Sequence, residues 1–320
     1  MRRTDIDYLR LSVTDRCNLH CIYCNPLDQQ GLTDRAAMLS TDEICRVVRL
    51  CVESGVARVR LTGGEPLVRS DIVALVRKLA GIKGITDLSL TTNGILLASM
   101  AQALKDAGLQ RVNVSLDATE GQCFRRMTGS GEFARVLDGI QKALAVGLAP
   151  VRINCVVLRT ANLSQVANLA EMSLHRPVSV RFIEYCPPGA KVDRKDWYVP
   201  NEEVRRLVES HLGPLSPAPA TQAGGPALYF RARGALGTIG FISGRSSTFC
   251  RRCSRLRLTC DGRLRPCLHC AKQYGLGTLL RSGASDNALL ILIGRALHEK
   301  SRYTKLDTTL ECFSMQHVGG

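Results

Sequence analysis

The sequence predicts an α/β fold in which a partial (β/α)6 TIM-type barrel is closed by a C-terminal α+β region. Two observations lead to this prediction: six short β-rich runs alternate with helical patterns, and a break rich in Pro, Gly and Ala follows them. Strands that alternate with helices of this length form parallel βαβ units. Because no clear seventh and eighth unit follows, we expect an open barrel with its chemistry at the carboxyl ends of the strands.

Local signals place the elements of the barrel. Ser40-x-x-Glu43 is a capping box that opens a helix, and Gly55 closes it. Ser70-Asp71 opens a second helix, and two further helices, over 98–107 and 133–146, end at Gly108 and Gly147. The six strands are expected near residues 8–13, 58–62, 87–91, 111–116, 151–158 and 178–184.

The composition divides the chain into a barrel over residues 1–212 and a C-terminal region over 227–320. Residues 213–226 (GPLSPAPATQAGGP) are typical of a linker or a long surface loop. In the C-terminal region, residues 227–233 and 238–243 resemble strands. Residues 256–260 and 264–268 flank Asp261-Gly262, which is a hairpin turn signal.

Composition also limits location and partners. The charged start of the chain has no apolar run behind it, so we expect no signal peptide. The longest apolar stretch, 288–293, is too short to span a bilayer, so we expect a cytoplasmic protein without a membrane partner. A net charge of +15 indicates an acidic partner, and 34 Arg against 9 Lys favours bidentate recognition of phosphate or carboxylate. Residues 245–265 alone hold seven arginines and one acid.

The chain has 14 cysteines, and disulfides are rare in a reducing compartment. Clustered cysteines in such a protein bind metal or carry out redox chemistry, whereas isolated ones are small buried hydrophobes. Six of the cysteines lie in two tight groups. The isolated ones that we expect to serve packing are Cys45, Cys51, Cys123, Cys155 and Cys312.

The first cysteine group is Cys17-x3-Cys21-x2-Cys24, just after the first strand. Three thiolates on one loop can hold three irons of a 4Fe–4S cube and leave the fourth iron open. An open iron can chelate the amino and carboxylate groups of S-adenosylmethionine (SAM), and the reduced cluster can then cleave SAM to a 5′-deoxyadenosyl radical. A zinc loop is the alternative, but the spacing is poor for zinc and no fourth ligand is obvious.

This spacing, with Tyr23 before the last cysteine, resembles the radical SAM superfamily. Gly63-Gly64-Glu65-Pro66 after the second strand adds to the resemblance. In that superfamily this motif meets the methionyl amino group of SAM through its backbone and carboxylate.

The second cysteine group is Cys250-x2-Cys253-x13-Cys267. With Cys270 it resembles a structural zinc ribbon, whereas the first three alone would form another three-ligand cluster with an open iron. The spacing leaves both interpretations open, and Cys260 is a further thiol in the same region.

The sequence around this group, FCRRCSRLRLTCDGRLRPCL over 249–268, closely resembles the GTP 3′,8-cyclases, the molybdenum cofactor biosynthesis protein A family. Other motifs follow in that family's order, and the chain ends in Gly319-Gly320 as that family does. These motifs are LRLSVTDRC at 9–17, RLTGGEP at 60–66, LTTNG at 90–94, NVSLD at 113–117 and RFIE at 181–184.

The resemblance implies conversion of GTP to 3′,8-cyclo-7,8-dihydro-GTP, the first step towards molybdopterin, with two 4Fe–4S clusters and SAM. It also implies an external one-electron donor, a downstream cyclic pyranopterin monophosphate synthase, a monomer or homodimer, and no nucleic-acid partner. Arginines from different strands would clamp the triphosphate between the clusters, which would hold ribose C3′ against guanine C8.

The site residues follow from the resemblance, position by position. Arg152 stands where the family often has Lys, and Cys186 where it often has Met. The first cluster would use Cys17, Cys21 and Cys24, and the second Cys250, Cys253 and Cys267. SAM would lie near Tyr23, Gly64, Glu65, Ser115 and Cys186. GTP would contact Arg10, Arg60, Thr91, Arg152, Arg255 and Arg257, and the catalytic residues would be Arg255, Arg257, Gly319 and Gly320.

Two other hypotheses stay open from the sequence. A peptide-modifying radical SAM enzyme with an auxiliary cluster would explain both cysteine groups, but not Arg255, Arg257 or the terminal glycines. A zinc-ribbon protein that binds nucleic acid would suit the positive charge, but it leaves the first cysteine motif unused. The sequence also lacks the basic stripe interleaved with aromatics that such a protein needs.

Overall fold

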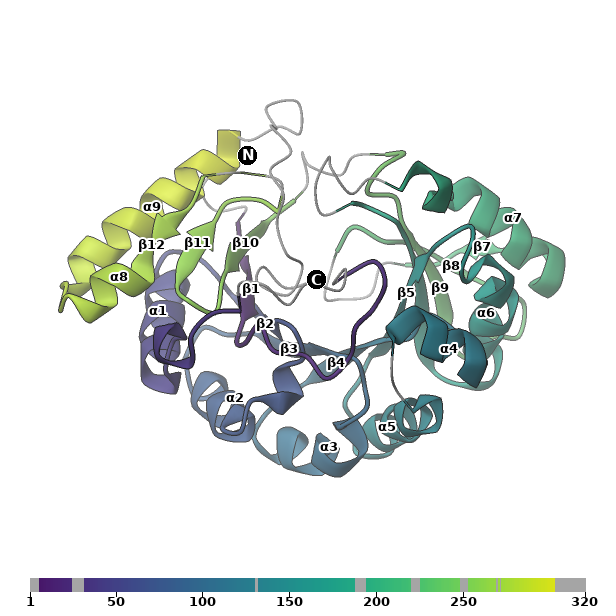
Figure 1. Cartoon of the computed structure of the whole chain (residues 1–320), viewed down its shortest axis with the longest axis horizontal. Coiled ribbons are helices and arrows are strands. Elements are labelled where there is room, and N and C mark those ends of the chain that lie inside the picture. Colours follow the sequence, from purple (N-terminus) through teal and green to yellow (C-terminus); the bar gives the residue numbers. More distant parts are fainter. Residues whose placement is uncertain are drawn as a thin grey trace.

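A computed structural model describes residues 6–24, 32–129, 132–187, 194–219, 225–247, 253–268, 270 and 272–302. The strands in these ranges form one twelve-stranded sheet, in the order β12-β11-β10-β1-β2-β3-β4-β5-β6-β9-β8-β7. Figure 1 shows the sheet curving into a partial barrel with helices along its outer side. The predicted fold class is confirmed.

The six predicted barrel strands are all present, and they pair in parallel and in chain order. Each lies within two residues of its expected bounds. They are β1 (Tyr8–Ser12), β2 (Arg58–Thr62), β3 (Asp87–Thr92), β4 (Arg111–Ser115), β5 (Val151–Val157) and β6 (Val178–Glu184).

Two further strands extend this set. The sequence predicted both as strands, over 238–243 and 256–260, but it did not indicate that they pair in parallel with the barrel strands. β9 (Thr238–Ile242) pairs in parallel with β6, and β10 (Arg255–Leu258) pairs in parallel with β1. They come from the C-terminal region, so no βαβ pattern marks them as barrel strands. In the described part of the chain the sheet stays open, with β12 and β7 at its two edges.

Antiparallel strands complete both edges of the sheet. β11 (Arg263–Arg265) pairs with β10 across the predicted Asp261-Gly262 turn, and β12 (Tyr274–Gly275) follows it. At the other edge lie β8 (Leu228–Arg231) and β7 (Ser216–Pro217). β7 is part of the segment expected as a linker, and it is paired rather than loose. The proposed domain boundaries themselves stay a prediction.

The four helices that the sequence predicted are all present close to their expected bounds. α1 (Thr41–Glu53) has both bonds of the capping box, since Ser40 Oγ accepts from Glu43 N and the Glu43 carboxylate accepts from Ser40 N. The other helices are α2 (Ile72–Ala80), α3 (Leu97–Asp106), α4 (Gly121–Thr128), α5 (Phe133–Ala145), α6 (Val166–His175), α7 (Asn201–Leu212), α8 (Leu276–Arg281) and α9 (Asp286–Arg302).

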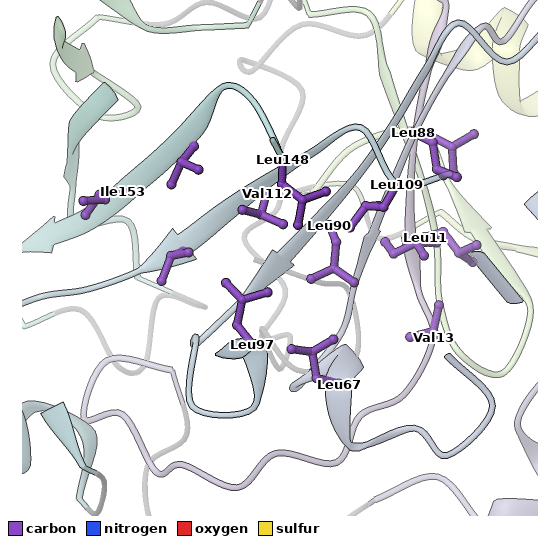
Figure 2. Packing of buried hydrophobic residues seen from close by; sticks show 14 of the residues in the cluster. Leu11, Val13, Leu67, Leu88, Leu90, Leu97, Leu109, Val112, Leu148 and Ile153 are labelled. Atoms are coloured by element: carbon purple, nitrogen blue, oxygen red, sulfur yellow. The ribbon is translucent and has the colours of Figure 1, made fainter. Parts of the chain in front are cut away.

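The two faces of the sheet differ in character. Successive side chains of a strand point to opposite faces. Leucine, valine and isoleucine occupy one face and pack against the helices; Figure 2 shows Leu11 of β1 and Leu90 of β3 on this face, with Leu97 of α3 in the same cluster. The alternate positions carry Arg, Ser, Asn and Thr, and most of these are also buried. The inner side of the barrel is therefore lined by polar side chains rather than by an apolar core.

The isolated cysteines serve packing, as expected. Cys45, Cys51, Cys123 and Cys155 are all buried, whereas Cys312 lies outside the described residues. In the described ranges, no helix has both the length and the apolar character needed to cross a membrane.

Candidate active site

Arginines on neighbouring strands lie side by side on the polar face of the sheet. Arg10 on β1 is in register with Arg60 on β2 and with Arg257 on β10. Adjacent strands are about 4.8 Å apart, so these three residues are direct neighbours although they come from separate sequence motifs. We call Arg257, Arg10 and Arg60 the arginine row.

The arginine row is a site of concentrated positive charge. Arg60 and Arg257 are only 5% and 6% exposed. Burial lowers the pKa of Arg60 to about 9 and that of Arg257 to about 10. Burial and the charges of Arg257, Arg255 and Arg60 hold the pKa of Arg10 well below its usual value. The buried Arg10 Nε has no hydrogen-bond partner among the described residues, so the row suits a polyanionic ligand.

A second group of polar side chains lies across β4, β5 and β6. Arg152 is fully buried and in register with Asn113. Arg181 donates from its Nε to Asn154 Oδ1 and from its Nη2 to Asn113 Oδ1, each over 2.9 Å. Asn113 in turn donates to Thr91 Oγ1 over 3.4 Å.

Arg181 was not among the arginines predicted to bind GTP, although its motif was noted. The period-two alternation of polar residues, in RVNVS of β4 and VRINC of β5, is the signal that could have found this network. This hydrogen-bond network connects β5, which bears Arg152, to β3, which bears Thr91.

The first cysteine loop is tied to the carboxyl end of the barrel. Ile22 N donates to Met127 O of α4 over 3.0 Å. The Tyr23 hydroxyl donates to Asp117 Oδ2, just beyond β4, over 2.7 Å. Asp117 is 3% exposed, and burial raises its pKa to about 6.

The three thiols of this loop lie close enough to act on one another. Burial raises the pKa of Cys24 to about 12, and the charges of Cys17 and Asp117 add to that effect. Burial, Asp117 and the other two thiols hold the pKa of Cys21 well above its usual value. Three neighbouring cysteines on one loop suit a metal cluster, because the positive charge of the metal favours the thiolate forms that this setting otherwise disfavours. The donor set therefore fits three ligands of a 4Fe–4S cluster.

Gly63 and Gly64 make close backbone contacts with Thr14 and Arg16, just before the first cysteine loop. Gly64 N donates to Thr14 O, and Glu65 N donates to Arg16 O, each over 2.8 Å. A Cβ on Gly63 would lie 2.1 Å from Thr14 O, and one on Gly64 would lie 2.3 Å from Arg16 O. No side chain fits there, so both glycines are needed to bring the two loops together.

The Glu65 carboxylate is also engaged within the chain. It accepts from Leu67 N over 2.9 Å, from Thr92 Oγ1 over 2.8 Å and from Asn93 N over 2.6 Å. The residue is 1% exposed, and burial raises its pKa to about 7. It ties the loop after β2 to the loop after β3, and its contact with SAM stays a prediction. Ser115 and Cys186, which are also predicted near SAM, are half-buried at the carboxyl ends of β4 and β6. They therefore lie at the same end of the strands as the first cysteine loop.

The described members of the second cysteine group, Cys253 and Cys267, lie at the opposite end of the parallel strands. Cys253 precedes β10, and Cys267 follows β11, which runs antiparallel to β10. Both therefore flank the amino end of β10, contrary to the expectation that all the chemistry lies at the carboxyl ends. The hairpin formed by β10 and β11 brings the two cysteines together. Cys250, Gly319 and Gly320 lie outside the described residues.

Cys253 is held by two cations. Its Sγ accepts from Arg255 Nε over 3.4 Å and from Lys300 Nζ of α9 over 3.3 Å. Burial alone would raise the pKa of this thiol, but the charges of Arg255 and Lys300 outweigh it and lower the pKa to about 6. The charges of Cys267 and Cys253 both raise the pKa of Arg257, against the lowering effect of burial, so this group adjoins the arginine row.

The extra thiols have different surroundings. Cys260 is 2% exposed beside Thr33 Oγ1 at 3.6 Å, and burial raises its pKa to about 11. Burial likewise raises the pKa of Cys270. Among the described residues, no three His, Cys, Asp or Glu side chains converge on a single metal ion. A four-iron cube does not need such convergence, because each cysteine binds a different iron.

Comparison with known proteins agrees with this arrangement. The Radical SAM superfamily matches residues 11–173, and Molybdenum Cofactor Synthesis C matches residues 178–306. The crystal structure of Streptococcus suis SuiB bound to precursor peptide SuiA shares the fold, with a TM-score of 0.52 at 22% identity over 63% of this chain and 44% of that chain. The chain is thus a member of the radical SAM superfamily, which implies a 4Fe–4S cluster and SAM.

Relatives of nearly full length narrow the assignment. The GTP 3′,8-cyclase of Pelotomaculum thermopropionicum is 45% identical over 99% of this chain and 98% of its own length. That of Heliobacterium modesticaldum is 46% identical over 92% of this chain and 91% of its own length. The chain belongs to the GTP 3′,8-cyclase family. This confirms the resemblance seen in the motifs and favours it over the peptide-modifying and zinc-ribbon alternatives.

Proposed function

We propose that the chain converts GTP to (8S)-3′,8-cyclo-7,8-dihydroguanosine 5′-triphosphate, the first step of molybdenum cofactor biosynthesis. The observation that carries this proposal is the arginine row, which lies between the two cysteine groups. Arg10 and Arg60 stand mid-strand, with the first cysteine loop beyond the carboxyl end of β1 and Cys253 before the amino end of β10. A substrate on the row would reach both groups.

The arginines would bind and orient the triphosphate. Guanidinium groups form paired hydrogen bonds with phosphate oxygens, and a buried setting strengthens them. Arg10 has an unpaired buried donor to offer among the described residues. The hydrogen bonds from Arg181 to Asn113 and Asn154 would fix the polar side chains beside Arg152. The residues proposed to contact GTP remain Arg10, Arg60, Thr91, Arg152, Arg255 and Arg257.

The first cysteine loop would hold the cluster that works with SAM. When bound, the cluster and SAM would supply the radical that takes hydrogen from ribose C3′. The chain's own task is to fix C3′ near C8 and to exclude water, which is catalysis by proximity. The residues proposed at SAM are Tyr23, Gly64, Glu65, Ser115 and Cys186, and the cluster ligands are Cys17, Cys21 and Cys24.

We further propose a second 4Fe–4S cluster on Cys250, Cys253 and Cys267, with its open iron towards the guanine base. The cations at Cys253 support this proposal because they favour the thiolate that iron binds. Arg255, Arg257, Gly319 and Gly320 are proposed to act in catalysis. An external donor would supply one electron, a cyclic pyranopterin monophosphate synthase would take the product, and the chain would act as a monomer or homodimer.

The decisive experiment is single-turnover assay of anaerobically purified protein with SAM, a chemical reductant and GTP deuterated at C3′. Deuterium in 5′-deoxyadenosine, together with cyclised product, is the expected result. Deuterium-free 5′-deoxyadenosine without cyclised product, from protein that binds its full iron, would contradict the proposal. Iron analysis accompanies it: we expect about eight irons per chain, falling to about four when Cys250, Cys253 and Cys267 are all changed to Ser.

A further inference from the structure

The two cysteine groups face side chains of opposite charge. Beside burial, the charge of Glu65 raises the pKa of Cys17 and that of Asp117 raises the pKa of Cys21, so the described neighbours of the first group include two carboxylates. Cys253 in the second group instead contacts two cations, Arg255 and Lys300. Arg255 is already proposed to contact GTP. Lys300 has no such role, and its position needs an explanation of its own.

Lys300 lies on the buried side of α9. This helix packs against α1, β11 and β12. Ile293, Ala296 and Leu297 are each 0% exposed, and Lys300 continues their stripe at helical spacing with only 5% exposure. A buried ammonium group is costly unless a partner offsets its lost hydration.

Cys253 supplies that partner, because no carboxylate does so in the described part of the chain. Nζ of Lys300 donates to Cys253 Sγ over 3.3 Å. The adjacent Glu299 points elsewhere, since its carboxylate pairs with Lys272 Nζ over 2.8 Å. The buried ammonium group of Lys300 is thus paired with a single cysteine sulfur.

We propose that Lys300 is a positioning residue for the second cluster, which holds Cys253 by a charged hydrogen bond and raises the reduction potential of that cluster. The inference rests on the proposed second cluster. One-electron reduction adds one negative charge to a cluster, and a fixed ammonium beside a ligand sulfur stabilises that charge. No proton needs to move. Hydrogen bonds to the sulfurs and local charge are known determinants of cluster potential.

The test measures the reduction potential of each cluster by EPR-monitored titration of the full chain, purified without oxygen. The variant is Lys300→Met, which keeps the length and burial of the side chain but removes the charge. Lys300→Arg restores the charge. Lys272→Met is the matched control, because Lys272 is an exposed neighbour paired with Glu299. The variant without Cys250, Cys253 and Cys267 identifies the first cluster's signal.

In Lys300→Met we expect the second cluster to shift to a lower potential while the first stays unchanged, with Lys300→Arg and Lys272→Met close to wild type. Loss of the second cluster's irons in Lys300→Met, restored in Lys300→Arg, would support the same role. An unchanged potential with full iron would overturn it, and so would iron loss that Lys300→Arg does not restore. If the wild type itself binds only about four irons per chain, the proposal of a second cluster is wrong, and the proposed role of Lys300 is then wrong as well.

Discussion

Tyr23 and Asp117 join the first cysteine loop to the end of β4 through a hydrogen bond of 2.7 Å between the Tyr23 hydroxyl and Asp117 Oδ2. The other oxygen, Oδ1, accepts from Val156 N over 2.8 Å, so one buried carboxylate connects the loop to β5 as well. Loss of the hydroxyl would leave Asp117 only partly satisfied. The position of the three thiols therefore depends on a residue that lies far along the chain.

Tyr23→Phe should lower the free energy of unfolding by about 1–3 kcal/mol, the cost of an unsatisfied buried acceptor. It should also slow reconstitution of the first cluster. Chemical denaturation and the rate of iron uptake are the measurements. Tyr8→Phe is the control, since the buried Tyr8 hydroxyl has no hydrogen-bond partner among the described residues. Equal losses in the two variants would show that the bond to Asp117 contributes nothing.

Gly64→Ala should prevent proper closure of the cysteine loop. Its Cβ would lie 2.3 Å from Arg16 O and 2.7 Å from Asp15 O, which are backbone atoms that cannot move independently. We expect a loss of at least about 2 kcal/mol and reduced iron content. Gly121→Ala, at the start of α4 with nothing within 4 Å, should be neutral or slightly stabilising. A stable, fully loaded Gly64→Ala protein would argue against the close contact.

Arg10→Met should weaken GTP binding and stabilise the protein without GTP. Loss of a charged hydrogen bond, worth about 1.5–3 kcal/mol, corresponds to roughly 10- to 150-fold in affinity. Relief of repulsion within the arginine row should raise the free energy of unfolding by about 1 kcal/mol or more. Calorimetric titration and thermal melting measure the two effects. Arg135→Met, on the exposed side of α5, should change neither.

The buried Glu65 should make stability depend on pH. Burial raises its pKa from 4.5 to about 7, so between these values the folded state binds more protons than the unfolded state. The free energy of unfolding should therefore fall as pH rises from about 4.5 to about 7, through the Glu65 contribution. Denaturation of wild type and Glu65→Gln across this range tests it, with a shallower slope expected in the variant. Parallel slopes would exclude Glu65 as the source.

Glu184→Ala should disturb the approach to the second cysteine group. Its carboxylate accepts from Asn201 N over 3.0 Å, from Arg245 N over 2.9 Å and from Ser246 N over 2.8 Å. It thus fixes the segment that leads towards Cys250. We expect loss of about four irons per chain while the first cluster's EPR signal persists. Glu203→Ala, which removes a more exposed carboxylate paired with Arg159, is the control and should retain all its iron.

Local sequence patterns were enough to predict the parts of this protein that depend on near neighbours. The spacing of Cys17, Cys21 and Cys24 indicated a three-ligand cluster, and Ser40 with Glu43 marked the start of α1. These signals act within a few residues, where chain geometry fixes what can meet. The six parallel strands were equally predictable, because each has its own β-rich run and a helix that follows it.

Contacts that depend on strand order and register could be seen only in the folded chain. The fold set Arg257 beside Arg10, because β10 adds to β1 from the far end of the chain. It brought Lys300 to Cys253 through the packing of α9, which no local pattern encodes. Lateral pairing of strands and the choice of helix partner depend on burial summed over the whole sheet. Neighbouring residues in the sequence therefore carry no direct record of them.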